Sequence, residues 1–196
     1  MIAQQLEIEY KNLLTKEEFS TIKRYFSLTD DCFNQQVNDY FDTKHLELAA
    51  RESALRIRRK KARYEMTLKQ RKQVGMLESN DAIRASEAQA FLKNQQFPRS
   101  AETIKSALDR IGIKEDRFVW LGTLTTNRAE LSYNDGLLVV DHSHYLGKDD
   151  YELEYEVNDE EKGRIVFSNL LDKLSIPKRE TPTKFERFML EKERQK

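Results

Sequence analysis

The sequence predicts a single α+β domain, spanning residues 1–196, in which strands outnumber helices. The first observation is that apolar and polar side chains alternate with a period of two in many segments, which is typical of strands with one buried face. The second is that capping patterns precede apolar residues at helical spacing in a few places. The third is that no Pro/Gly-rich linker, repeat or low-complexity segment divides the chain, whose 196 residues suffice for one well-filled domain.

The chain begins with the clearest strand pattern. Residues 4–12 alternate, so that one face of the strand is apolar and the other is charged. A helix is expected next, because Thr15 and Glu18 form a capping-box pattern ahead of an apolar stripe. The apolar face of the strand, which we expect to be buried, comprises Leu6, Ile8 and Tyr10, and the charged face comprises Glu7, Glu9 and Lys11.

The middle of the chain mixes extended and helical patterns. Residues 72–81 contain Gly75 and show no periodicity, which predicts a mobile loop. Helices are expected over residues 86–94, beginning at a capping pattern that starts with Ser86, and over residues 101–111. Period-two alternation predicts strands at residues 33–41, 54–59 and 64–70.

The C-terminal part returns to strands and ends in helices. Asn134-Asp135-Gly136 predicts a tight hairpin turn, because these residues tolerate positive φ. Trp120 and its apolar neighbours are expected in the core. Strands are predicted at residues 117–131, 137–145 and 151–157, and helices at residues 164–174 and 184–193.

The charge composition restricts the function more than the fold. Charged residues make up 35% of the chain, against about 25% in an average domain, which indicates either solvated helices and tails or charges gathered in a site. The 34 basic and 34 acidic residues give zero net charge, so nucleic acid is not an expected partner. Cys32 is the single cysteine, which excludes an intrachain disulfide and a thiol-based zinc cluster.

The N-terminal residues and the hydropathy predict a cytoplasmic protein. Residues 1–5 lack the basic and apolar regions of a signal peptide. No apolar run approaches the roughly 20 residues that are needed to cross a bilayer. No membrane partner is therefore expected.

The polar faces of the predicted strands are sorted by the sign of their charge. An acidic face favours a divalent metal, because hard cations prefer carboxylate oxygens. A basic face favours an anion with several oxygens, because guanidinium groups match phosphate geometry. A nucleotide or polyphosphate with its metal satisfies both, and the alternative is an exposed sheet whose charges guard its edges. The side chains concerned are Arg56 and Arg58, Thr67 and Lys69, Arg128 and Glu130, Asp141, and Glu152, Glu154 and Glu156.

These residues resemble, in order, the motifs of the CYTH domain, also called the triphosphate tunnel metalloenzyme family. The resemblance covers residues 4–188, and its ordered set of motifs is much more specific than any one of them. Thr183 departs from the more usual serine of the last motif but keeps the hydroxyl. The matching segments are Glu7-Ile8-Glu9-Tyr10-Lys11, Tyr40-Phe41-Asp42-Thr43, Leu55-Arg56-Ile57-Arg58, Thr67-Leu68-Lys69, Arg128, Asp141, Glu152-Leu153-Glu154 and Thr183-Lys184-Phe185.

The resemblance implies an eight-stranded antiparallel β-barrel that is open as a tunnel, with helices packed outside. It implies that Mg²⁺ or Mn²⁺ is held by Glu7, Glu9, Asp141, Glu152 and Glu154. The implied phosphate-binding residues are Lys11, Arg56, Arg58, Lys69, Arg128 and Lys184. Of these sets, Glu9, Lys11, Lys69 and Arg128 are expected to be catalytic, while the participation of Glu130 and Glu156 is left open.

The implied activity is metal-dependent hydrolysis of a small-molecule triphosphate. The substrate would be inorganic triphosphate, thiamine triphosphate or a nucleoside triphosphate. Two alternatives remain: an adenylate cyclase that makes cyclic AMP from ATP, and a polyphosphate- or nucleotide-binding module without turnover. His142 and His144 have the opposite parity to Asp141, so they are expected to face outward and to take no part in the site.

Overall fold

The computed structural model describes residues 4–114 and 118–196, so the predicted strand start at Arg117 lies outside the described residues. Eight strands form a closed barrel in the order β1-β5-β4-β3-β2-β6-β7-β8, which confirms the expected fold class. The strands are β1 (Gln4–Leu14), β2 (Asn34–Thr43), β3 (Ser53–Lys60), β4 (Arg63–Arg71), β5 (Met76–Ile83), β6 (Phe118–Tyr133), β7 (Gly136–Tyr145) and β8 (Lys148–Val157). The helices are α1 (Lys16–Tyr25), α2 (Ala85–Asn94), α3 (Glu102–Arg110), α4 (Glu160–Lys173) and α5 (Lys184–Arg194), with short 3-10 turns η1 (Asp30–Cys32) and η2 (Ala49–Arg51).

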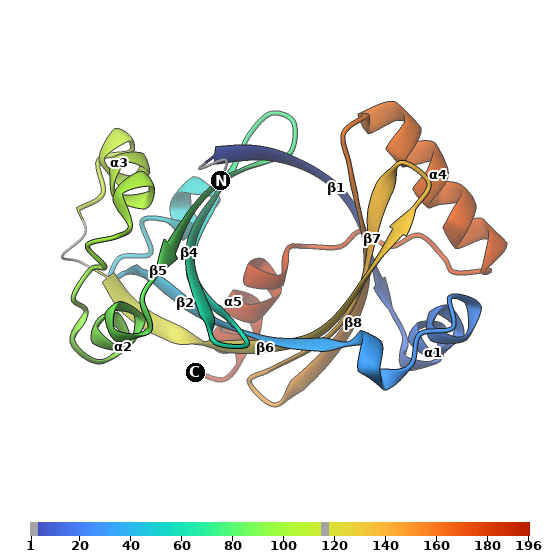
Figure 1. Ribbon diagram of the computed structural model, residues 1–196, viewed down its shortest axis with the longest axis horizontal. Coiled ribbons are helices and arrows are strands. Elements are labelled where there is room, and N and C mark those ends of the chain that lie inside the picture. Colours follow the sequence, from blue (N-terminus) through green and yellow to red (C-terminus); the bar gives the residue numbers. More distant parts are fainter. Residues whose placement is uncertain (1–3, 115–117) are drawn as a thin grey trace. The chain divides into compact units, whose positions relative to one another are not determined.

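One compact unit comprises the chain up to Leu6 together with Gln36–Leu124. In it, α2 and α3 pack on one face of the β3–β4–β5 sheet, as the green helices of Figure 1 show beside β4 and β5. Strand residues such as Leu55, Met66 and Leu68 meet the helices in a buried apolar cluster. This packing leaves the opposite face of the sheet, which we call the inner face, to the charged side chains.

The second compact unit comprises Glu7–Gln35 and Thr125–Lys196. Here α1 and α4 pack against β8, as Figure 1 shows, over a buried cluster that includes Leu153, Tyr155 and Phe167. Gly163 in α4 permits this approach, because a Cβ there would lie 2.6 Å from a methyl group of Val157. The face of the sheet opposite α1 and α4 is the inner face of this unit.

Local signals account for several element boundaries. Thr15 and Glu18 form a capping box at the start of α1, and Thr183 and Glu186 form another at the start of α5. The β6–β7 hairpin turns at Asn134, whose φ of 48° matches the predicted tolerance of positive φ. The fourth helix begins at residue 160, four residues before the predicted start, because the Asp159 side chain caps it.

The predicted loop at residues 72–81 was wrong over most of its length, because β5 occupies Met76–Ile83. Its helix-packed face carries the polar residues Ser79 and Asp81, which removed the expected alternation. Ser79 is fully buried there, and its hydroxyl accepts a hydrogen bond from Gln4. Asp81 accepts a hydrogen bond from the backbone N–H of Ile104 in the first turn of α3. The strand thus satisfies a helix terminus where an ordinary strand would bury an apolar side chain.

Three smaller predictions also differ from the structure. Trp120 is 52% exposed instead of lying in the core, and its indole N–H donates to Asp39. Leu6 is 51% exposed, although Ile8 and Tyr10 are half-buried as part of the same strand face. The second helix begins at residue 85 instead of 86. The side chain of Glu87 accepts a hydrogen bond from the backbone N–H of Arg84, the residue before the helix.

Among the described residues, no helix is long and apolar enough to span a membrane.

Candidate functional site

The inner face of β8 carries the three carboxylates that alternate with its buried apolar residues. In the antiparallel ladder with β1, Glu156 lies opposite Glu9, and Glu154 lies opposite Lys11. In the ladder with β7, Glu152 lies opposite Asp141. Strand register therefore gathers acidic residues from three adjacent strands of the second unit on one face.

Two cations neutralise the middle of this acidic face. Arg128 makes a bidentate contact to Asp141, with Nε–Oδ1 and Nη2–Oδ2 distances of 2.8 and 2.6 Å, and its Nη2 lies 2.7 Å from Glu154. Lys184, from the first turn of α5, lies 2.9 Å from Asp141, 2.7 Å from Glu152 and 2.5 Å from Glu154. Burial opposes ionisation of Glu154, but Lys184 and Arg128 hold its pKa well below its usual range. These ionised groups form a fully paired, buried network.

A third cation, Arg187, was missed in the sequence analysis. Its guanidinium donates to Glu152 at 2.7 Å and to Asp150 at 2.9 Å, while Tyr145 donates to the same Asp150 oxygen at 2.5 Å. Burial acts against the charged form, but Glu152 keeps the pKa of Arg187 above its usual range. The spacing of three residues from Lys184 places both cations on one side of α5, which is the signal that could have found it.

A second acidic cluster lies beside this network. One carboxylate oxygen from each of Glu7, Glu9 and Glu156 lies within 4.8 Å of the others. Lys11 forms an ion pair with Glu9. Burial, followed by the neighbouring Glu7 carboxylate, raises the pKa of Glu156 to about 7. The carboxylates of this cluster are therefore close enough to repel one another, and carboxylate oxygens are the ligands that hard divalent cations prefer. The donor set fits Mg²⁺ or Mn²⁺.

The inner face of the first unit is basic and hydrogen-bonding. Arg58 donates from Nε to the side-chain oxygen of Asn38 on β2, at 3.0 Å. Lys69 on β4 forms an ion pair with Glu78, which lies opposite it on β5. Arg56 is only 9% exposed, and its Nε has no hydrogen-bond partner among the described residues. These side chains suit an oxygen-rich anion.

The structure thus divides the eleven predicted site residues between the two units. Eight of them lie on the acidic inner face of the second unit: Glu7, Glu9, Lys11, Arg128, Asp141, Glu152, Glu154 and Lys184. The other three, Arg56, Arg58 and Lys69, lie together on the inner face of the first unit. Glu156, left open before, joins Glu7 and Glu9, whereas Glu130 is exposed. Glu78 was missed because its strand was predicted as a loop.

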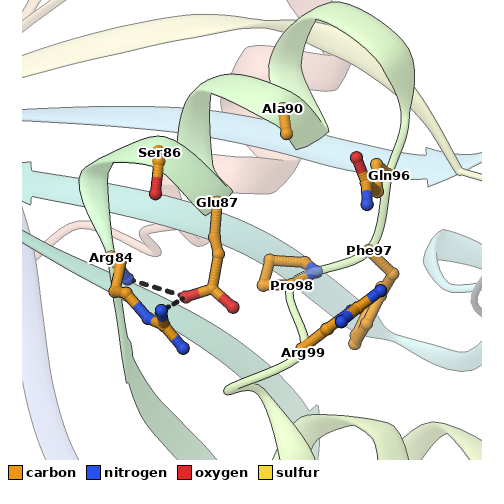
Figure 2. Close-up of a pocket in the computed structure, with 8 residues that line it drawn as sticks. All are labelled: Arg84, Ser86, Glu87, Ala90, Gln96, Phe97, Pro98 and Arg99. Atoms are coloured by element: carbon orange, nitrogen blue, oxygen red, sulfur yellow. Dashed lines mark hydrogen bonds and ion pairs between the residues drawn. The ribbon is translucent and has the colours of Figure 1, made fainter.

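Two other groups of polar residues lie apart from these faces. The His142 ring stacks on Tyr151, and its Nε2 lies 2.7 Å from Asp149. His142 therefore projects from the strand face opposite to that of Asp141, as expected. In the first unit, Figure 2 shows a surface hollow beside α2 in which Glu87 points toward Arg84. Ser100 also donates to Glu87, so the carboxylate is already occupied, and none of the predicted site residues lines the hollow.

The chain is similar to known proteins over nearly its whole length. The CYTH domain family model matches residues 5–189. The chain is 42% identical over 191 residues to the Bacillus subtilis protein "Putative triphosphatase YjbK", covering 97% of this chain and 98% of that protein. A crystal structure of a "putative adenylate cyclase" from Bacillus halodurans has a TM-score of 0.91 and 38% identity, over 95% of this chain and 99% of that one.

A second solved structure is more distant in sequence. The Hippeastrum protein HpAC1, called a "putative adenylyl cyclase" with a dominant triphosphatase activity, has a TM-score of 0.81 and 26% identity, over 94% of this chain and 96% of that one. The family match and the similarity at 42% identity both extend over nearly the whole chain. The chain therefore belongs to the CYTH domain family.

Proposed function

We propose that this protein hydrolyses a small-molecule triphosphate to a diphosphate and orthophosphate with the help of a divalent metal. One observation carries the proposal: beside the network around Lys184, the acidic inner face gathers carboxylate oxygens of Glu7, Glu9 and Glu156 within 4.8 Å of one another. Binding of an anion alone would need only cations. The additional carboxylate cluster supports a metal that accompanies the phosphates.

The metal would be held by Glu7, Glu9 and Glu156, with Glu154 one pleat away on the same strand face. When bound, Mg²⁺ or Mn²⁺ would neutralise phosphate charge and activate water for in-line attack. Asp141 and Glu152 are engaged by Arg128, Lys184 and Arg187, so we assign them the role of holding these cations in position. Compared with the metal ligands implied by the resemblance, this proposal removes Asp141 and Glu152 and adds Glu156.

The basic side chains of the two inner faces would bind phosphate oxygens. Arg128 and Lys184 are ordered by buried carboxylates before a ligand arrives, and Lys11 lies beside them on β1. Arg56, Arg58 and Lys69 offer further donors on the inner face of the first unit. During phosphoryl transfer, negative charge spreads over the oxygens of the transferred group, so fixed cations lower the barrier without moving far. Glu9, Lys11, Lys69 and Arg128 remain the proposed catalytic residues.

The similar proteins support hydrolysis over the alternatives. The Bacillus subtilis relative is named a triphosphatase, and the Hippeastrum protein is described with a dominant triphosphatase activity. The Bacillus halodurans structure carries the name of an adenylate cyclase, which keeps cyclisation as the second candidate. Cyclisation requires recognition of a base and ribose, and the inner-face residues described above recognise oxygens and cations.

The products formed from a substrate panel test the proposal. Inorganic triphosphate, thiamine triphosphate and ATP are each incubated with the protein and Mg²⁺ or Mn²⁺. Orthophosphate with the matching diphosphate is expected, and it should disappear with EDTA and in the Glu156→Gln variant. The exposed Glu180→Gln variant is the matched control. Pyrophosphate together with cyclic AMP would establish the cyclase instead, and tight binding without any product would establish a binding module.

A further inference from the structure

Three adjacent strands of the first unit place polar side chains in a single row across the sheet. Arg56 on β3 lies opposite Thr67 on β4, and Thr67 lies opposite Asn80 on β5. All three project from the inner face, since Leu55, Met66 and Leu68 project from the other face into the cluster under α2 and α3. Directly opposed residues in a ladder have Cβ atoms about 5 Å apart, so the row is continuous.

Each member of the row has a buried polar atom without a hydrogen-bond partner among the described residues. These atoms are Arg56 Nε, Thr67 Oγ1 and Asn80 Oδ1. Arg56 is 9% exposed and Thr67 is fully buried, so neither group is simply solvated at the surface. Buried polar groups are normally paired, and three unpaired atoms in register are a reason to expect a ligand. Elsewhere on the same face, Arg58 and Lys69 are engaged by Asn38 and Glu78.

The chemistry of the row matches a phosphoryl group. The guanidinium of Arg56 and the hydroxyl of Thr67 both donate hydrogen bonds. The Asn80 amide nitrogen Nδ2 carries two hydrogens, and its long contact of 3.5 Å to Glu78 uses one of them, which leaves the other to donate. Three donors would then converge from three strands. A terminal phosphoryl group offers three unbridged acceptor oxygens, whereas an internal one offers two.

We propose that Arg56, Thr67 and Asn80 form a binding row for the terminal phosphoryl group of the triphosphate, in which the neutral donors Thr67 and Asn80 supply hydrogen bonds beside the Arg56 guanidinium. This inference rests on the proposed function. It adds two uncharged residues to the charged set, and it assigns the β5 strand a direct role in binding. Because the row contains a single formal charge, its contribution depends on hydrogen-bond geometry more than on total charge.

Binding of inorganic triphosphate, measured by calorimetry with Ca²⁺ in place of Mg²⁺, tests the row separately from turnover. Thr67→Val keeps the shape of the side chain and removes only the hydroxyl, and Asn80→Leu removes the amide. We expect each to weaken binding about tenfold. Under turnover conditions with Mg²⁺, KM should rise about tenfold with kcat changed less than threefold. Ser79→Ala, on the same strand but the opposite face, is the matched control and should bind as wild type does.

Stability distinguishes a binding role from a structural one. Since Thr67 Oγ1 has no protein partner, Thr67→Val should unfold at the same or a higher urea concentration than wild type while binding more weakly. Binding by both variants within twofold of wild type would overturn the row even if the wild type hydrolyses triphosphate. Selective loss of binding without any wild-type turnover would support the row and refute the hydrolase. If Asn80→Leu does not fold, the result with Thr67→Val decides.

Discussion

Replacing Glu156 with glutamine tests the carboxylate cluster before any substrate is known. Burial and the Glu7 carboxylate raise the pKa of Glu156 from its ordinary value of 4.5 to about 7. Between these two pH values the folded protein keeps a proton that the unfolded chain has lost. The contribution of this group to the free energy of unfolding therefore falls as the pH rises from about 4.5 to about 7, and stays low above that.

The magnitude follows from the interval between the two pKa values. At 1.36 kcal/mol per pKa unit, the interval from 4.5 to about 7 corresponds to about 3.4 kcal/mol. Glu156 is only half-buried, so solvent screening reduces the effect, and about 1–2 kcal/mol is expected. Glutamine has the same shape without the charge. In EDTA, Glu156→Gln should thus be more stable than wild type by this amount at pH 8.5 and equal to it at pH 4.

Urea unfolding followed by circular dichroism measures the difference at both pH values. Addition of excess Mn²⁺ at pH 8.5 should reverse the order, because the wild type binds the metal and the variant lacks a ligand. The exposed Glu180→Gln variant should follow the wild type throughout. A Glu156→Gln protein that is less stable than wild type in EDTA at pH 8.5 would refute the electrostatic reasoning. Equal stabilisation of both proteins by Mn²⁺ would refute the metal site.

Glu9→Gln should abolish metal-dependent orthophosphate release while leaving the circular dichroism spectrum intact, and unchanged release would contradict its role. Arg187→Met should lower the free energy of unfolding by about 3 kcal/mol, because it removes the guanidinium that pairs with Asp150 and with Glu152, which is 1% exposed. Urea unfolding measures this change. A loss below about 1 kcal/mol would argue against the network. In the same assay, Thr183→Ala should lower the free energy of unfolding by about 1 kcal/mol, because it removes the side-chain cap of α5. Thr183→Ser keeps the hydroxyl and should retain the cap. Equal losses of stability in the two variants would exclude the cap as the cause.

The predictions that succeeded rested on local periodicity. Alternation placed Glu7, Glu9 and Lys11 on one strand face, and Thr15 with Glu18 marked the start of α1, because side-chain direction and helix capping depend on neighbours within a few residues. The prediction failed at β5, whose helix-packed face carries Ser79 and Asp81. These polar residues bond to Gln4 and to the start of α3, which are distant in the sequence.

The role of an individual charge was harder to predict than its direction. Periodicity placed Glu152, Glu154 and Glu156 on one face without distinguishing among them. In the structure, Lys184 and Arg187 from α5 engage Glu152, while strand register brings Glu156 beside Glu7 and Glu9. A similar limit applies to Trp120, because the absence of a covering element cannot be known from the strand that carries it.

The sequence by itself determined the α+β class, the strand faces and the set of charged residues from which a site could be built. Tertiary structure decided which carboxylates lie against the cations of α5 and which cluster around Glu156. It also decided that Arg56, Thr67 and Asn80 lie in one row. The physical reason is that side-chain direction repeats every two residues within a strand, whereas ion pairing depends on ladder register and on a helix that begins 30 residues after Glu154 along the chain.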